Sequence, residues 1–172
     1  MRSQLRATVV LAAASLLLLT ACSGSTEEES AAPTSTLSSV FDFTARTVSG
    51  PDFAGADLVG QPVVMWFWAP WCTICRAESP AVATVAAEFD GRVTFVGVAG
   101  RGQQEDMVVF VEETGTDDFT QLADVDGSLW SRFGIVAQPS FVFVTPDGQT
   151  QVFAGSLGVE ELRDAADQLL AG

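Results

Sequence analysis

The stretch from Val63 to Cys75 constrains the fold more than any other part of this 172-residue chain. Six apolar residues, VVMWFW, stand between Pro62 and Ala69-Pro70, and their β-branched and aromatic character predicts a strand buried on both faces. After Pro70, apolar residues recur at the spacing of a helix, so a helix is predicted to follow the strand. Five apolar side chains are expected on the inward face of that helix: Ala77, Ala81, Val82, Val85 and Phe89. A buried strand that leads into a helix is typical of an α/β sheet.

Two cysteines lie where this helix is expected to begin. Cys72 is predicted at the helix N-terminus and Cys75 one turn further in. Unpaired N–H groups and the helix dipole favour a thiolate there, so Cys72 is the expected nucleophile. Cys75 would lie under the same turn, close enough to attack a mixed disulfide formed at Cys72. The pair is therefore predicted to be a dithiol/disulfide redox site.

A structural disulfide and half of a zinc site are the alternative roles for this pair. A disulfide that closes so small a loop adds little stability. A zinc site would need further Cys or His ligands, and the chain has no His and one other cysteine, Cys22. The sequence therefore predicts neither a metal site nor a cofactor.

The charge of the chain limits its partners. Eight basic residues, all of them Arg, stand against 22 acidic ones, for a formal net charge of −14. Nucleic acids and anionic membrane surfaces attract basic patches, so neither is an expected binding partner. The absence of His also removes His-assisted base catalysis.

The first 21 residues have the plan of a secretory signal. Arg2 and Arg6 precede an apolar run over residues 7–19 that is too short for a comfortable transmembrane helix. The run ends in Leu19-Thr20-Ala21-Cys22, which resembles the bacterial lipobox, where cleavage precedes a lipidated cysteine. A lipid on Cys22 would anchor the protein to the outer face of the cell membrane. A plain signal peptide with an incidental Cys22 is the alternative.

The remaining chain predicts a tether and one domain. Residues 22–39 are rich in Ser, Thr, Ala and Glu and have little to bury, so they are expected to be disordered. Residues 40–172 suit a single core. The expected elements are an edge strand over 41–48, a return strand from Phe53, a helical turn at 56–60, strand 93–99, helix 103–114, helix 126–133, strands 141–145 and 151–154, and a final helix that buries Val159, Leu162, Ala166 and Leu169.

Several motifs resemble one family. WAPWCTIC, residues 68–75, is similar to the WCxxC active site of thioredoxin-fold proteins, and CRAESP, residues 75–80, to the CxxExP extension of the TlpA/ResA/DsbE branch. Further matches are VGVAG at 96–100, DGSLW at 126–130 and QPSFVF at 138–143. From Phe41 onward the chain looks most like secreted actinobacterial DsbE/DsbF-type proteins. The resemblance implies a thioredoxin fold, a mixed sheet flanked by helices with an N-terminal β-hairpin extension.

The resemblance also implies roles for residues outside the cysteine pair. Pro139 stands where thioredoxin folds keep a cis-proline facing the redox pair, which would leave the Gln138 backbone free to pair with an extended substrate peptide. Trp71 is expected to border the substrate surface, and Trp68 to pack beneath the active-site loop. Glu78 is expected either to tune the cysteines or relay protons as a buried carboxylate, or merely to complement the helix dipole.

Two positions depart from the family pattern. Trp66 stands six residues before Cys72, where cytosolic thioredoxins often have a buried acid, so proton transfer cannot use that route. The dipeptide between the cysteines, which tunes thiolate stability and redox potential, is Thr73-Ile74 and indicates neither direction of electron flow.

The expected function is that of an extracytoplasmic thiol-disulfide oxidoreductase. It would donate its Cys72–Cys75 disulfide to reduced exported proteins and be reset by a membrane redox partner, and it is expected to be a monomer. The oxidising direction follows from the resemblance to DsbE/DsbF-type proteins, which are associated with oxidative folding. One alternative is a specific reductant of apocytochrome c or a similar client, and another is a non-catalytic client-binding or redox-sensing module.

Overall fold

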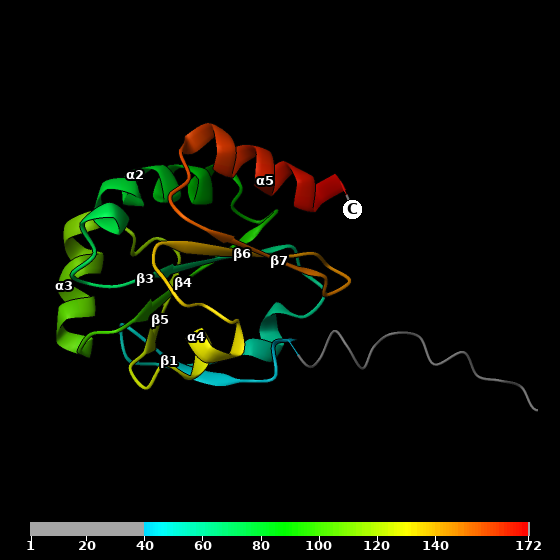
Figure 1. Cartoon of the computed structure of the whole chain (residues 1–172). Coiled ribbons are helices and arrows are strands. Elements are labelled where there is room, and N and C mark those ends of the chain that lie inside the picture. Colours follow the sequence, from blue (N-terminus) through cyan, green and yellow to red (C-terminus); the bar gives the residue numbers. More distant parts are fainter. Residues whose placement is uncertain (1–39, 172) are drawn as a thin grey trace, which may run out of the picture. The chain divides into compact units, whose positions relative to one another are not determined.

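The computed structural model describes residues 40–171, in which one mixed sheet organises the chain (Figure 1). The strands are β1 Thr44–Thr47, β2 Asp52–Ala54, β3 Val63–Trp68, β4 Thr94–Gly100, β5 Thr120–Asp124, β6 Ser140–Val144 and β7 Thr150–Ala154. The helices are α2 Thr73–Glu88, α3 Gln104–Thr114, α4 Ser128–Arg132 and α5 Val159–Ala171, and a 3-10 helix, η1, covers Gly55–Leu58. The signal peptide and tether predicted for residues 1–39 lie outside the described residues.

The apolar stretch that opened the sequence analysis forms the central strand, β3. The strand order is β2-β1-β5-β4-β3-β6-β7, with β3 parallel to β4 and antiparallel to β6. All six β3 residues are buried, as predicted. Successive side chains of a strand point to opposite faces, so β3 supplies three residues to each of two cores. Val64, Trp66 and Trp68 enter one core, and Val63, Met65 and Phe67 enter the other.

The two cores lie on opposite faces of the sheet. Side chains from α2, α3 and α5 pack on the first face, and side chains from η1 and α4 on the second (Figure 1). Helix α2 begins just after the end of β3, and β6 starts beside the same end, because Ser140 pairs with Phe67. This topology brings the cysteines together with the residues that precede β6.

Two parts of the predicted topology are wrong. β1 is not an edge strand, since it pairs with β2 on one side and β5 on the other, and β2 forms the edge. Strand β5 was not predicted, because its sequence, TQLAD, lacks an apolar run. Its Gln121 is nevertheless buried, in space that Gly97 leaves free by having no side chain. The Gln121 amide accepts a hydrogen bond from the Trp68 indole and donates one to the Thr116 carbonyl, which satisfies its polar atoms.

The inward face of α2 is also shifted from the prediction. Ala77 is exposed, whereas Glu78 and Ser79 are buried. Cys75 and Val82, two helical turns apart, fix the buried stripe, and residues 78 and 79 fall between them on the same face. The burial of Glu78 agrees with the first of the two roles considered for it, a buried carboxylate, whereas the burial of Ser79 was not predicted.

Helix α2 continues through Pro80 because Ser79 compensates for it. Proline has no N–H to donate to the carbonyl four residues earlier, which here belongs to Arg76. The Ser79 hydroxyl donates to that carbonyl at 2.8 Å instead. The buried position of Ser79 is therefore explained by the proline that follows it.

Candidate active site

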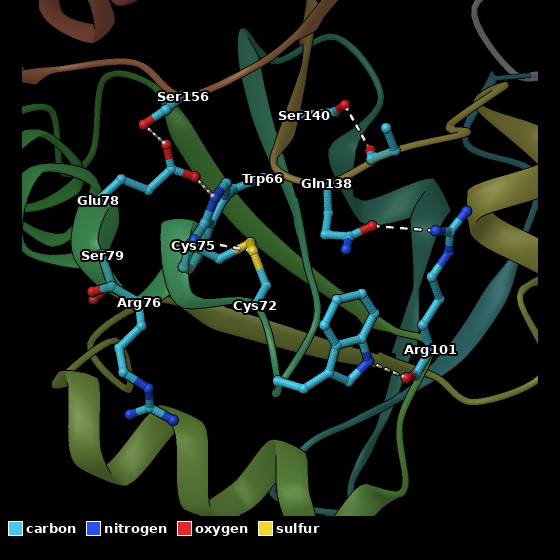
Figure 2. Close-up of a disulfide and its surroundings, with 12 residues drawn as sticks. Trp66, Cys72, Cys75, Arg76, Glu78, Ser79, Arg101, Gln138, Ser140 and Ser156 are labelled. Carbon is cyan, nitrogen blue, oxygen red and sulfur yellow. Dashed lines mark hydrogen bonds between the residues drawn. A yellow bond between two sulfur atoms is a disulfide. The ribbon is translucent and has the colours of Figure 1, made fainter.

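The two cysteines form a disulfide at the start of α2, with their Cα atoms 5.3 Å apart. Cys72 caps the helix, and its Sγ accepts a hydrogen bond from the Cys75 N–H at 3.0 Å (Figure 2). Cys72 is 5% exposed and Cys75 is fully buried. Cys72 is therefore the more accessible of the two cysteines, and the N–H bonded to its sulfur favours a thiolate there once the pair is reduced.

Two tryptophans shortly before the cysteines differ in burial. Trp68 is fully buried and stacks on Phe110 with 4.1 Å between ring centroids. Trp71 is 59% exposed, and its indole N–H donates to the Arg101 carbonyl at 2.8 Å. Trp68 is thus a core residue and Trp71 a surface residue, and the contact of Trp71 with substrate stays a prediction.

Glu78 is buried in a polar pocket of its own. One carboxylate oxygen accepts from the Trp66 indole at 2.7 Å, and the other from the Ser156 hydroxyl at 2.6 Å and the Leu157 N–H at 3.2 Å. Figure 2 shows the carboxylate pointing toward Ser156 and Trp66. Among residues 40–171, no hydrogen bond joins the carboxylate to either cysteine sulfur. Trp66 replaces the buried acid of cytosolic thioredoxins, but its indole donates a hydrogen bond to a different buried acid, Glu78 on α2.

The environment of Glu78 raises the pKa of its carboxyl. The side chain is only 5% exposed, and burial disfavours the charged form, whereas the bonds from Ser156, Trp66 and Leu157 favour it. Burial outweighs the three donors, so the pKa lies above its ordinary value of 4.5. Glu78 can therefore hold a proton at a higher pH than an exposed glutamate.

The loop before β6 completes the site. The peptide bond between Gln138 and Pro139 is cis, as the family resemblance implied. Pro139 is buried and Gln138 half-buried. Within the described part of the chain, the main-chain N–H and C=O of Gln138 take part in no backbone hydrogen bond outside the helices and strands.

Arg101 is the residue at this site that the sequence analysis did not single out. It follows β4, and its guanidinium donates to the Val136 carbonyl at 2.8 Å and to the Gln138 side-chain oxygen at 3.2 Å. The guanidinium also lies over the Trp130 ring, 4.8 Å from its centroid. The sequence predicted only that a strand ends at residue 99, just before Arg101 and its flanking glycines, Gly100 and Gly102.

The predicted site residues thus gather around the start of α2, with one exception. Cys72, Cys75 and Trp71 lie in the loop and the first turn, Glu78 one turn later, and the 138–139 peptide at the start of β6. Cys22 lies outside the described residues. A disulfide whose Cys72 is its slightly exposed member, and which lies near the main chain of Gln138 (Figure 2), is suited to exchange with thiols of another chain.

Comparison with known proteins agrees with this geometry. The model of the AhpC/TSA family matches residues 37–152. Among relatives, the soluble secreted antigen MPT53 of Mycobacterium tuberculosis is 48% identical over 106 residues, which cover 62% of this chain and 60% of that protein. The match therefore spans less than two thirds of that relative's length.

This chain matches two solved structures over nearly their whole length. MTB dsbF, in mixed oxidised and reduced forms, is 46% identical with a TM-score of 0.73, and the match covers 76% of this chain and 96% of that one. A secreted M. tuberculosis disulfide oxidoreductase homologous to E. coli DsbE is 40% identical with a TM-score of 0.72, covering 76% and 98%. The predicted thioredoxin fold and the resemblance to DsbE/DsbF-type proteins are confirmed.

A membrane-spanning helix was sought in the same part of the chain. Within residues 40–171, every helix is too short or too polar to cross a bilayer.

Proposed function

Because the chain belongs to the AhpC/TSA family of thioredoxin-fold proteins, we propose that it is a thiol-disulfide oxidoreductase that donates its disulfide to reduced exported proteins. The observation that carries the proposal is the Cys72–Cys75 disulfide at the N-terminus of α2, with Cys72 alone open to attack. The proteins it resembles include a disulfide oxidoreductase, which supports the activity.

The exchange takes two steps. A client thiolate attacks the Cys72 sulfur, a client–Cys72 disulfide forms, and Cys75 leaves as a thiolate that takes up a proton. A second client thiol then loses its proton and attacks the client sulfur of this mixed disulfide, which releases Cys72 as a thiolate. The client loses two electrons and two protons, and the cysteine pair gains two electrons. A membrane-bound acceptor of thiol electrons would then restore the disulfide.

The client is proposed to dock along the loop before β6. The free main-chain groups of Gln138 would pair with an extended client segment as an added strand, with buried Pro139 fixing the loop behind it. Trp71, 59% exposed beside Cys72, would contact the client on the other side. Reduced, unfolded proteins offer such extended segments, which supports them as the substrate class.

Glu78 is proposed to supply the proton that Cys75 needs. Cys75 is fully buried, so its thiolate is poorly solvated and depends on a nearby proton donor. Glu78 lies one turn further along α2 and has a raised pKa. Because the carboxylate does not bond to the sulfur, the proton would cross through water.

The direction of electron flow is tested by the reduction potential of the pair. The measurement uses residues 22–172 with Cys22→Ser, a two-cysteine background, equilibrated against glutathione buffers. We expect a value near that of strong oxidants, about −120 mV. A value at or below about −270 mV would instead favour the reductant of apocytochrome c or a similar client. An oxidising potential without any turnover of reduced client would favour the non-catalytic module.

Export and anchoring are a separate part of the proposal. The signal-like residues 1–21 and the lipobox-like ending at Cys22 support secretion followed by lipidation. We expect labelled palmitate to be incorporated into the full-length protein in a lipoprotein-forming bacterium, and the protein to stay with the membrane fraction. Cys22→Ser should lose both. A wild-type protein that is released without label would show instead a plain signal peptide, and MPT53 is described as soluble and secreted.

A further inference from the structure

Arg101 lies in an unusual backbone conformation between two loops of the active site. Its φ of 56° is in the left-handed region, and among the described residues it is the one non-glycine with a positive φ. The glycines on either side cannot be replaced without collision, since an added Cβ would lie 2.4 Å from the Trp130 ring at Gly100 and 2.4 Å from Pro70 at Gly102. The backbone of the loop therefore passes close to Trp130 and Pro70, and Arg101 is the one residue of the three that carries a side chain. A side-chain-bearing residue kept in this region points to a role beyond the loop itself.

The contacts of Arg101 join the two loops that flank the disulfide. Its main-chain carbonyl accepts the Trp71 indole N–H, which fixes the residue directly before Cys72. Its guanidinium donates to the Val136 carbonyl and the Gln138 side chain, which fixes the loop before Pro139. Figure 2 shows the guanidinium facing the Gln138 amide. We call this set of four residues, Trp71, Arg101, Val136 and Gln138, the Arg101 clamp.

The partners of the clamp have little packing of their own to hold them. Trp71 is 59% exposed and Val136 is 80% exposed, so burial contributes little to their positions. Exposed loops of this kind are the parts of a fold that open most easily. A planar guanidinium with divergent donors can fix two loop groups at once, which a lysine ammonium does less well. Stacking on Trp130 orients that plane.

We propose that Arg101 is a positioning residue for client exchange: it holds Trp71 and the 136–138 loop at a fixed separation, as two walls between which the client chain lies. This inference rests on the proposed function. Its consequence is a division between substrates. A client chain needs both walls, whereas a small dithiol reaches the Cys72 sulfur without them.

The test compares Arg101→Met with wild type in the two-cysteine background. The client is a reduced peptide with two cysteines joined by a flexible spacer, and the small dithiol is dithiothreitol. We expect the KM for the peptide to rise about tenfold, since misplaced binding groups weaken the productive geometry. The kcat for the peptide and the rate constant with dithiothreitol should stay within about twofold of wild type, and the reduction potential should be unchanged. The reason is that the substitution affects binding of the peptide and leaves the reacting sulfurs in place.

Two further variants make the test specific. Arg101→Lys keeps the positive charge and the aliphatic part of the side chain but loses the planar guanidinium with its divergent donors, so its peptide KM should rise as in Arg101→Met. It replaces Arg101→Met in the test if the Met variant does not fold. Arg92→Met is the matched control, because Arg92 also stacks on a ring, that of Phe89, and donates to a main-chain carbonyl far from the cysteines. It should behave as wild type.

Each other outcome overturns the inference. An unchanged peptide KM in Arg101→Met would show that the clamp does not position the client. Equal slowing with peptide and dithiothreitol would show a general effect on the cysteines, and full activity in Arg101→Lys would show that charge alone matters. If wild type itself fails to oxidise the peptide, the proposed function fails, which is a result distinct from any of these.

Discussion

Cys72→Ser is expected to reduce disulfide exchange with both peptide and dithiothreitol to background, a loss on the order of 1000-fold or more, as for other enzymes that lose their nucleophile. The reason is the unequal burial of the two sulfurs. Cys75 is fully buried, so without Cys72 no sulfur of the pair is open to a thiolate from solvent. The measurement is the rate of peptide oxidation by pre-oxidised protein, followed by loss of free thiols.

Cys75→Ser should lose turnover as well but should trap a client. In this variant the Cys72 thiolate attacks the disulfide of an oxidised peptide, the reverse of donation, and no Cys75 is present to release the product. We expect a covalent adduct, visible by mass spectrometry and removed by dithiothreitol. Cys72→Ser, treated in the same way, should form none. Equal adducts from both variants would contradict the assignment of Cys72 as the attacking sulfur.

The fold was predictable where the local sequence pattern alone indicates burial and secondary structure. The six apolar residues of β3 and the cysteines that follow predicted the central strand and the start of α2, and both are present. Strand β5 could not be predicted in this way, because its buried Gln121 is compatible with a core only through the space at Gly97 and the bonds to Trp68 and Thr116. Those partners lie in other segments of the chain, so the sequence pattern around Gln121 does not indicate that it is buried.

The same difference separates the predicted and the missed parts of the site. The cysteines, Trp71 and the 138–139 peptide are marked by short motifs, and the sequence located each of them. Arg101 and Ser156 make their contacts at the site through hydrogen bonds to segments that are far away in the chain. The Gly100-Arg101-Gly102 triplet did contain a signal, since an arginine between two glycines at a strand end indicates a backbone held close to other groups.

Glu78→Gln is expected to slow the attack of dithiothreitol on the disulfide by roughly 100-fold at pH values below the raised pKa of Glu78, because the buried Cys75 thiolate loses its proton donor. The donor is the protonated carboxyl, and its fraction falls as the pH rises through the raised pKa of Glu78. The ratio of wild-type to variant rate, each corrected for the thiolate fraction of dithiothreitol, should therefore fall toward one at high pH. Stopped-flow rates across the pH range measure this ratio.

Ser156→Ala separates a proton donor from a merely structural carboxylate. The Ser156 hydroxyl lowers the pKa of Glu78, so its removal should raise that pKa further and move the fall in the rate ratio to higher pH. A profile that stays in place, or a Glu78→Gln rate within twofold of wild type at every pH, would contradict the proton-donor role.

Stability provides an independent reading of the same group. Since the folded state binds the proton more tightly than the unfolded chain, the free energy of unfolding of wild type relative to Glu78→Gln should fall as the pH rises from 4.5 through the raised pKa. Glu105→Gln, an exposed acid on α3, controls for the removal of one negative charge. A rate profile and a stability profile that bend at the same pH would identify one titrating group, Glu78, behind both.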